Sequence, residues 1–109
     1  MIVEESKPKS VIIHMDRFSL SKDLQLEAIE EFKELCLSSG TKVCAEVSGK
    51  IDRPSSNFFV KQGKLEEIKQ YVDSNKANLV IFNNDLSPSQ ERNLEKYLCA
   101  RVLDRTSLI

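Results

Sequence analysis

The chain has 109 residues, the length of a single domain with one hydrophobic core. Hydrophobic residues make up 40% of it, and 16 Lys and Arg against 17 Asp and Glu leave a net charge of −1. These values exclude a disordered chain and a strongly basic, nucleic-acid-like one, so only local charge can indicate a partner. The sequence has no signal-peptide pattern and no apolar run long enough to cross a bilayer, which predicts a cytoplasmic protein without a membrane partner.

The first half of the chain predicts a leader, a strand, a helix and a second strand. Residues 1–9 have no periodic pattern, so we expect a flexible leader ahead of a domain at 10–109. Apolar residues at helical spacing, opposite an acidic face, indicate the helix, and Gly40 is placed to end it in the left-handed conformation. The predicted strands are residues 10–15 and 42–48, and the predicted helix is residues 22–38.

The second half opens with an irregular segment, residues 49–64, which is longer than a connector needs. Helices are then predicted at 64–74 and 88–99, and strands at 78–83 and 101–104. Strand and helix alternate throughout. The fold class expected is therefore α/β: a small three-layer unit with a mainly parallel four-stranded sheet flanked by helices. In such sheets ligands bind beyond the carboxyl ends of the strands.

The irregular loop concentrates positive charge, with four basic side chains against one carboxylate and two adjacent phenylalanines. Basic groups that meet phosphate, interleaved with rings that stack on bases, favour RNA contact. The alternative is that one ring enters the core and the other covers a strand end. At the predicted start of the following helix, free N–H groups favour an anion, although this too is compatible with plain helix entry. The candidate contact residues are Lys50, Arg53, Phe59, Lys61, Gly63 and Lys64.

The segment before the third helix predicts a helix cap. Ser87 is placed as N-cap, Pro88 as the first helical residue and Gln90 as the partner that reaches back to the cap amide. Four neighbouring polar residues are explained by neither capping nor packing. We expect them to form a second contact surface or to brace the loop, and they are Asn84, Asp85, Arg92 and Asn93.

The sequence predicts no catalytic group and no metal site. A P-loop would need glycine and a hydroxyl where the chain has Phe58 and Leu65, and three glycines are too few for a dinucleotide fingerprint. His14 lies in an apolar strand and is expected to be a satisfied structural histidine. The cysteines form no CxxC pair, and we expect reduced, mainly buried thiols at Cys36, Cys44 and Cys99.

Four ordered segments resemble one protein family. They are DRP at 52–54, GKLEEI at 63–68, LVIFNNDLSPSQERNLEK at 79–96 and RVLDRTSLI at 101–109. Together they closely resemble the N-terminal domain of the HflX-type GTPases. The resemblance implies a cytoplasmic protein that binds and hydrolyses GTP with Mg²⁺ in a separate GTPase domain. This chain does not contain that domain, so it is expected to be non-catalytic and to hold no cofactor of its own.

The resemblance also implies partners, namely the large ribosomal subunit with its rRNA and the protein's own GTPase domain. The leading expectation is a domain that helps to dock the protein on that subunit. The alternatives are an ATP-binding domain with weak hydrolytic activity, or a module that only braces the GTPase domain. Lys61 stands where the family usually has glycine, which weakens a nucleotide-cradling loop and adds a charge suited to RNA. The apolar ending of the chain predicts that the protein continues.

Overall fold

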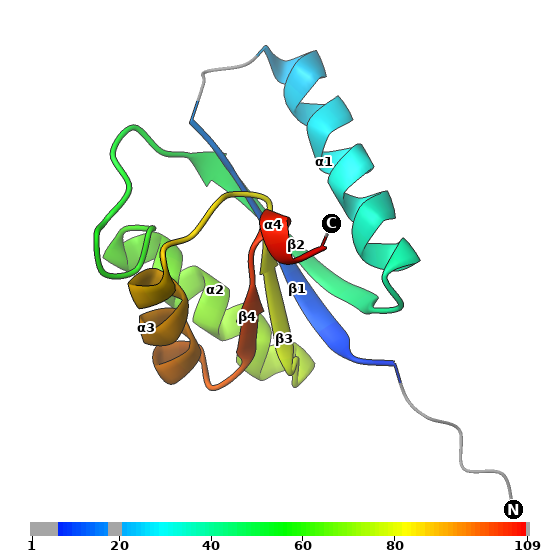
Figure 1. The fold of residues 1–109 in the computed structure, drawn as a ribbon. Helices are drawn as coiled ribbons and strands as arrows, with labels where there is room; N and C mark the ends of the chain where they lie inside the picture. Colours follow the sequence, from blue (N-terminus) through cyan, green and yellow to red (C-terminus); the bar gives the residue numbers. More distant parts are fainter. Residues whose placement is uncertain (1–6, 18–20, 109) are drawn as a thin grey trace, which may run out of the picture.

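The computed structural model describes residues 7–17 and 21–108, which form one parallel sheet with helices on both faces (Figure 1). The elements are β1 (Lys9–Asp16), α1 (Lys22–Ser38), β2 (Lys42–Lys50), α2 (Gln62–Asn75), β3 (Leu79–Phe82), α3 (Pro88–Leu98), β4 (Arg101–Leu103) and α4 (Arg105–Leu108). The predicted α/β class is confirmed. The sheet is parallel at every strand pair, and the short helix α4 was not predicted.

The strand order, β2-β1-β3-β4, places the two most apolar strands at the centre of the sheet. Every residue of β3 is buried, and β1 is buried over most of its length. A strand that is covered on both faces reads as a continuous apolar run. By contrast, β2 lies at an edge, and only Val47 of its nine residues is buried, while the others are half-buried or exposed.

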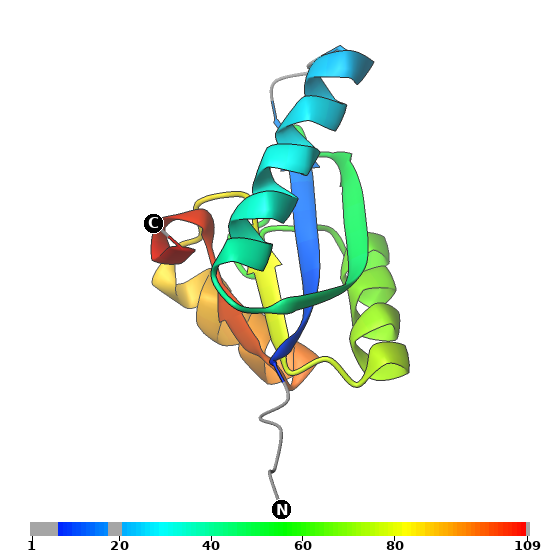
Figure 2. The ribbon, with the colours of Figure 1, turned by 90° about the vertical axis from the view of Figure 1, so that its right-hand side faces the viewer.

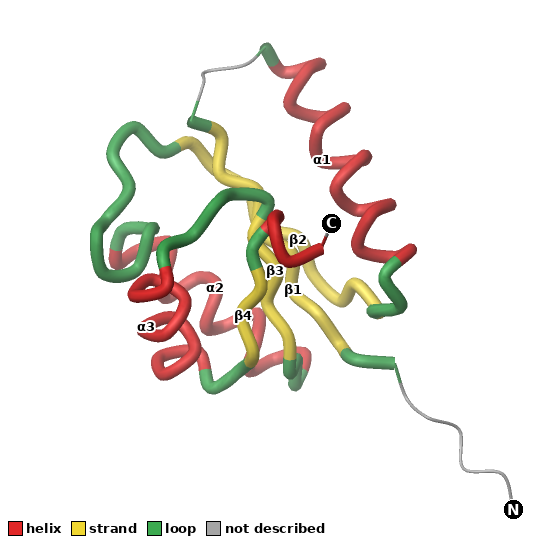
Figure 3. The backbone as a smooth tube through the Cα atoms, viewed as in Figure 1, coloured by secondary structure: helices red, strands yellow, loops and turns green. Residues whose placement is uncertain are grey.

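Two apolar layers hold the helices to the sheet. On one face, α2 and α3 contribute Leu65, Ile68 and Leu94 to a large cluster with β1 and β3. On the other face, α1 contributes only Phe32 and Cys36 to a smaller cluster. Figures 2 and 3 show α1 on one side of the sheet, with α2 and α3 on the other. The α1 face is therefore covered by much less apolar surface.

The helix ends agree with local sequence chemistry. Ser87 and Gln90 form the predicted capping box, with Ser87 N–H donating to Gln90 Oε1 at 2.8 Å and Gln90 N–H donating to Ser87 Oγ at 3.1 Å. Gly40 follows α1 with a φ of 93°, the left-handed conformation predicted for it. Lys76 and Cys99 end α2 and α3 in the same region of φ, although neither is glycine.

The expected leader and the expected burial of the cysteines can be compared with the described residues. At the end of the expected leader, β1 already begins at Lys9, and the Pro8 carbonyl accepts from the Lys42 N–H at 2.8 Å. The rest of the expected leader, residues 1–6, lies outside the described residues. Of the cysteines, Cys36 is buried, but Cys44 is half-buried and Cys99 is exposed. No helix among the described residues is long and apolar enough to cross a membrane.

Candidate functional site

Three lysines meet at the start of α2, beside the carboxyl ends of β1 and β2. Lys50, Lys61 and Lys64 line a hollow of about 200 Å³ together with Met15, Ile51 and Asp52. Lys61 is the N-cap of α2, and no side chain caps this helix end. The first-turn N–H groups of a 14-residue helix therefore add a positive dipole end to the lysine charges. This arrangement suits an anion such as phosphate.

The three lysines differ in how firmly the protein holds them. Lys64 Nζ donates to the Ser48 carbonyl and to Glu67 Oε1, both at 3.0 Å, so its charge is partly committed. Gly49 leaves room for this approach, because a Cβ there would lie 3.2 Å from Lys64 Nζ and the lysine would have to shift by a few tenths of an ångström. Lys50 and Lys61 are exposed. The sequence prediction missed Gly49, which matters more here than the exposed Gly63, where a Cβ would meet nothing within 4 Å.

Phe59 is a core residue and not a contact residue, which corrects the sequence prediction. Its side chain is 2% exposed and its ring meets that of Phe82 edge-on, with centroids 6.1 Å apart. The turn that aims it inward is held by Ser55, which exchanges two backbone hydrogen bonds of 3.0 Å with Phe59. Phe59 also has a φ of 66°, which a bulky residue adopts only at a cost. Burial of the ring offsets that cost.

The neighbouring ring, Phe58, reaches the surface instead. It is half-buried and meets Tyr97 edge-on, with centroids 5.9 Å apart. Both rings line a shallow hollow of about 270 Å³ with Asn93 and Lys96. An aromatic surface beside a lysine can stack a base and meet its phosphate. The sequence prediction missed Tyr97 and Lys96, because helical spacing assigns them to the packing stripe and the solvent face.

Helix α3 braces the basic loop, as predicted for Asn93. Asn93 Nδ2 donates to the Asn57 carbonyl at 3.0 Å, and Gln90 Nε2 donates to the Ser55 carbonyl at 2.7 Å. Of the other members of the predicted second surface, Arg92 is exposed, and Asp85 accepts a hydrogen bond of 2.9 Å from Thr106 Oγ1. A contact surface formed by these residues together with Asn84 stays a prediction.

Asn84 joins two strands at the point where the strand order changes direction, between β1 and β3. Its side-chain amide donates to the Met15 carbonyl at 2.9 Å and accepts from the Met15 N–H at 3.3 Å. In parallel sheets a ligand crevice opens at such a point. Here the Asn84 amide takes the place of a strand partner for the Met15 backbone. Asn84 is therefore a structural residue.

His14 is only half satisfied. Arg105 Nη1 donates to Asn83 Oδ1 at 3.4 Å, which leaves Asn83 Nδ2 to donate to His14 Nδ1 at 2.8 Å. His14 Nε2 then carries the proton, and it is buried without an acceptor among the described residues. Burial lowers the pKa of His14 from its ordinary 6.5, against the opposing charge of Asp16 and with the help of Arg105. The histidine is neutral at physiological pH.

The chain matches known proteins over most of its length. A family model described as GTP-binding GTPase N-terminal matches residues 26–109. The GTPase HflX of Escherichia coli (strain K12) is 37% identical over 101 residues, or 93% of this chain. The chain belongs to the HflX GTPase N-terminal domain family. The GTPase HflX of Flavobacterium psychrophilum is 34% identical over 101 residues, again 93% of this chain.

These HflX relatives are much longer than the chain, which spans 23% and 24% of their lengths. Among solved structures, the fold resembles a GTP-binding protein from the hyperthermophilic archaeon Sulfolobus solfataricus in complex with GDP. That match has a TM-score of 0.62 and 21% identity, and it covers 92% of this chain and 28% of the archaeal chain. A crystal structure of an SsGBP variant matches with a TM-score of 0.66, 22% identity, and 92% and 30% coverage.

Proposed function

We propose that this domain helps to dock its protein on the large ribosomal subunit in the cytoplasm by contacting rRNA phosphates at the basic hollow. The observation that carries the proposal is the convergence of Lys50, Lys61 and Lys64 on the uncapped N-terminus of α2. The exposed Arg53 lies in the same loop. Such a site binds the phosphate backbone without reading sequence.

The aromatic hollow on α3 supports the same function from a second direction. Phe58 and Tyr97 offer ring surface beside Lys96. Gln90 and Asn93 tie α3 to the loop that runs from this hollow to Lys61, so the two sites are held in a fixed relation. A single-stranded or looped RNA segment could then place a phosphate on the lysines and stack a base on the rings.

The alternative is that ATP occupies the lysine hollow and is slowly hydrolysed. The hollow has about 200 Å³, less than the volume of ordinary small-molecule sites. Between the ends of β1 and β3, where a base or ribose would extend, the Asn84 amide is already hydrogen-bonded to the Met15 backbone. We therefore favour RNA phosphate over a free nucleotide.

GTP and Mg²⁺ belong, in this proposal, to a GTPase domain outside these 109 residues. The HflX relatives are named GTPases and are about four times as long as the chain. The chain itself has no P-loop sequence. A role as a brace for that GTPase domain is a further alternative. It is favoured by Leu103 and Leu108, which remain half-buried on the thinly covered α1 face.

The deciding experiment measures binding of the chain to purified large ribosomal subunits between 50 and 300 mM salt. For Lys50→Ala/Lys61→Ala we expect weaker binding and a log–log salt slope reduced by about 1.4, since each lost phosphate contact on a single strand removes about 0.7. The matched control is Lys22→Ala/Lys42→Ala, which removes two exposed lysines elsewhere and should leave the slope nearly unchanged. Equal slopes for the two double variants would refute RNA contact at this hollow.

A parallel titration separates the alternatives. NMR shifts at Lys61 and Gly63 with millimolar ATP, without any change in ribosome binding for Lys50→Ala/Lys61→Ala, would support the nucleotide site. If the lysines are dispensable for ribosome binding, and binding requires instead that the GTPase domain cover Leu103 and Leu108, the domain acts as a brace for the GTPase domain.

A further inference from the structure

The edge strand β2 leaves most of one backbone edge open. It is nine residues long and pairs only with β1. The Ile51 N–H donates to the Asp16 carbonyl at 2.9 Å, and backbone groups alternate in direction along a strand. The N–H and C=O groups of Glu46 and Ser48 therefore point away from β1, whereas the register shift beside Val43 interrupts this alternation before Cys44. A long open edge is a template for another strand.

Only part of this edge is protected. At one end, Lys64 Nζ donates to the Ser48 carbonyl at 3.0 Å. At the other end, the pairing of β2 with β1 shifts register beside Val43. Charged side chains and such irregularities are the usual protections of an edge. Between them, both backbone groups of Glu46 and the N–H of Ser48 point outward along the described edge. They offer three hydrogen-bonding groups to an incoming strand.

Helix α1 presents a matching stripe of side chains beside the same edge. Leu26, Glu30, Lys33 and Leu37 are spaced by four, three and four residues and so share one face. Leu26 is 58% exposed and Leu37 is 49% exposed. Between the leucines, Lys33 Nζ lies 3.4 Å from Glu46 Oε2, which ties the stripe to β2. The stripe is apolar at its ends and carries one acid, Glu30, and one base, Lys33, at its centre.

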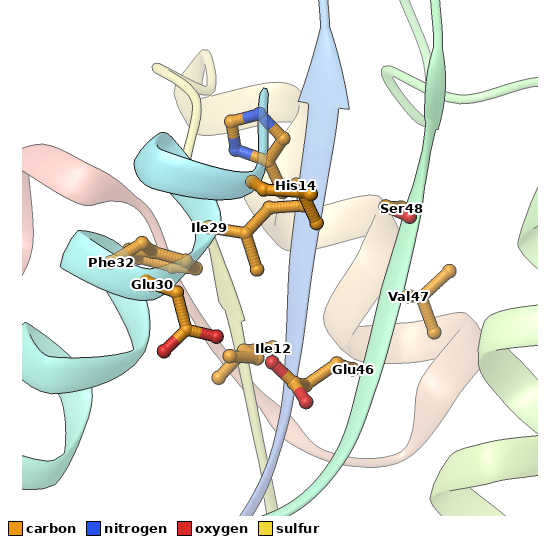
Figure 4. A pocket seen from close by; sticks show the side chains of 9 residues that line it. Ile12, His14, Ile29, Glu30, Phe32, Glu46, Val47 and Ser48 are labelled. Atoms are coloured by element: carbon orange, nitrogen blue, oxygen red, sulfur yellow. The ribbon is translucent and has the colours of Figure 1, made fainter. Parts of the chain in front are cut away.

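A hollow of about 250 Å³ separates α1 from β1 and β2 and continues the apolar surface. Figure 4 shows Ile12, Ile29 and Phe32 along it, with the carboxylates of Glu30 and Glu46 at one end. Apolar side chains that enter from the β2 edge would find apolar walls. A cation entering beside them would find two carboxylates against the single charge of Lys33.

We propose that the β2 edge binds an extended peptide segment of a partner protein as a fifth strand. Its side chains on the α1 side have the pattern apolar, any, basic, any, apolar. The basic residue lies opposite Glu46, and the apolar residues meet Leu26 and Leu37. The leucines are separated by 11 residues, or about 16 Å along the helix. Alternate side chains over five strand residues span about 14 Å, so one short segment reaches both.

Charge argues against a second copy of this chain as the occupant. The antiparallel register that pairs all nine residues of β2 with its copy is centred on Glu46. It would place Glu46 opposite Glu46 and Lys42 opposite Lys50. Like charges directly opposite one another destabilise a strand pair. A basic-centred peptide has no such conflict.

The test uses the 109-residue chain and a blocked heptapeptide, Thr-Val-Thr-Lys-Thr-Val-Thr, followed by ¹⁵N NMR and amide exchange. We expect shifts and slowed exchange at Glu46 and Ser48, and weaker binding of the same peptide with Glu in place of Lys. Glu46→Lys should weaken the Lys peptide on the order of tenfold and reverse the preference between the two peptides. Glu66→Lys, on α2, is the matched control and should leave the preference unchanged.

Glu46→Pro tests the backbone contact separately, because it removes an outward N–H and spares the pairing with β1. It should abolish peptide binding in a protein whose melting curve shows that it is still folded. Shifts that avoid β2, equal affinity of the two peptides for the unmodified chain, or full binding by a folded Glu46→Pro variant would overturn the proposal. So would concentration-dependent dimerisation that Glu46→Pro abolishes, because the edge would then belong to a second copy.

Discussion

The side chain of Gln90 caps its own helix with one atom and holds Ser55, 35 residues away, with another. Oε1 accepts from the Ser87 N–H at 2.8 Å, while Nε2 donates to the Ser55 carbonyl at 2.7 Å. Local helix chemistry and the placement of the basic loop therefore meet in a single amide. The two roles can be separated by substitution.

Gln90→Glu keeps the acceptor for the cap and loses the donor to Ser55. We expect a loss of about 1 kcal/mol in the free energy of unfolding, as for a typical hydrogen bond, and faster amide exchange in the loop. Ser87→Ala, which removes the cap hydroxyl and spares the brace, should cost about 1 kcal/mol without that local effect. Urea denaturation and hydrogen exchange together measure both. Identical loop exchange in the two variants would contradict the brace.

Phe59→Ala should lower the free energy of unfolding by about 3–5 kcal/mol, because it empties a fully buried aromatic site. Phe58→Ala should cost clearly less, since that ring is half-buried. Phe59→Gly should be no less stable than Phe59→Ala, because glycine adopts a φ of 66° without strain. Denaturant titrations of the three variants test this order. A smaller loss for Phe59→Ala than for Phe58→Ala would reject the assignment of the two rings.

The stability of the domain should fall as the pH drops below about 6.5. The pKa of His14 is lowered in the folded protein, mainly by burial, so the unfolded state binds its proton first. The contribution of His14 to the free energy of unfolding is therefore fully present at pH values above the unfolded-state pKa. It is lost as the pH falls toward the lower pKa of His14 in the folded protein. His14 is the only histidine in the chain, and His14→Gln should flatten the dependence between pH 7.5 and 5.5. Urea midpoints across this range measure the effect, and an NMR titration of the His14 ring gives its folded pKa directly. An unchanged slope in His14→Gln would assign the effect to other groups.

The thiols should react with an aromatic disulfide reagent in the order of their exposure. Cys99 is exposed and should react first, whereas Cys36 is buried and burial raises its pKa to about 11. Cys36 should therefore be modified only on unfolding, which makes its rate a probe of α1 detachment. Mass spectrometry of the partly labelled protein assigns the sites. Rapid labelling of Cys36 under native conditions would show that α1 leaves the sheet more readily than its packing implies.

Sequence alone determined the features that depend on near neighbours. The capping box at Ser87, the left-handed Gly40 and the alternation of strands and helices all follow from contacts within a few residues. Conformational preferences and short-range hydrogen bonds fix such contacts before the chain is folded.

Only the tertiary structure decided which side chains are available to a partner. Phe58 and Phe59 are adjacent and have the same side chain, yet Phe58 is half-buried and Phe59 is fully buried. The difference arises because the turn at Ser55 directs the Phe59 ring toward Phe82. From the sequence, Asn84 has the character of a surface residue. In the folded protein β1 lies beside β3, and the Asn84 amide donates to the carbonyl of Met15, which is 69 residues away in the sequence. Hydrogen bonds and burial across such separations depend on the strand order, which periodicity does not specify. For the same reason, only the strand order shows that β2 pairs with β1 on one side and has an open edge on the other.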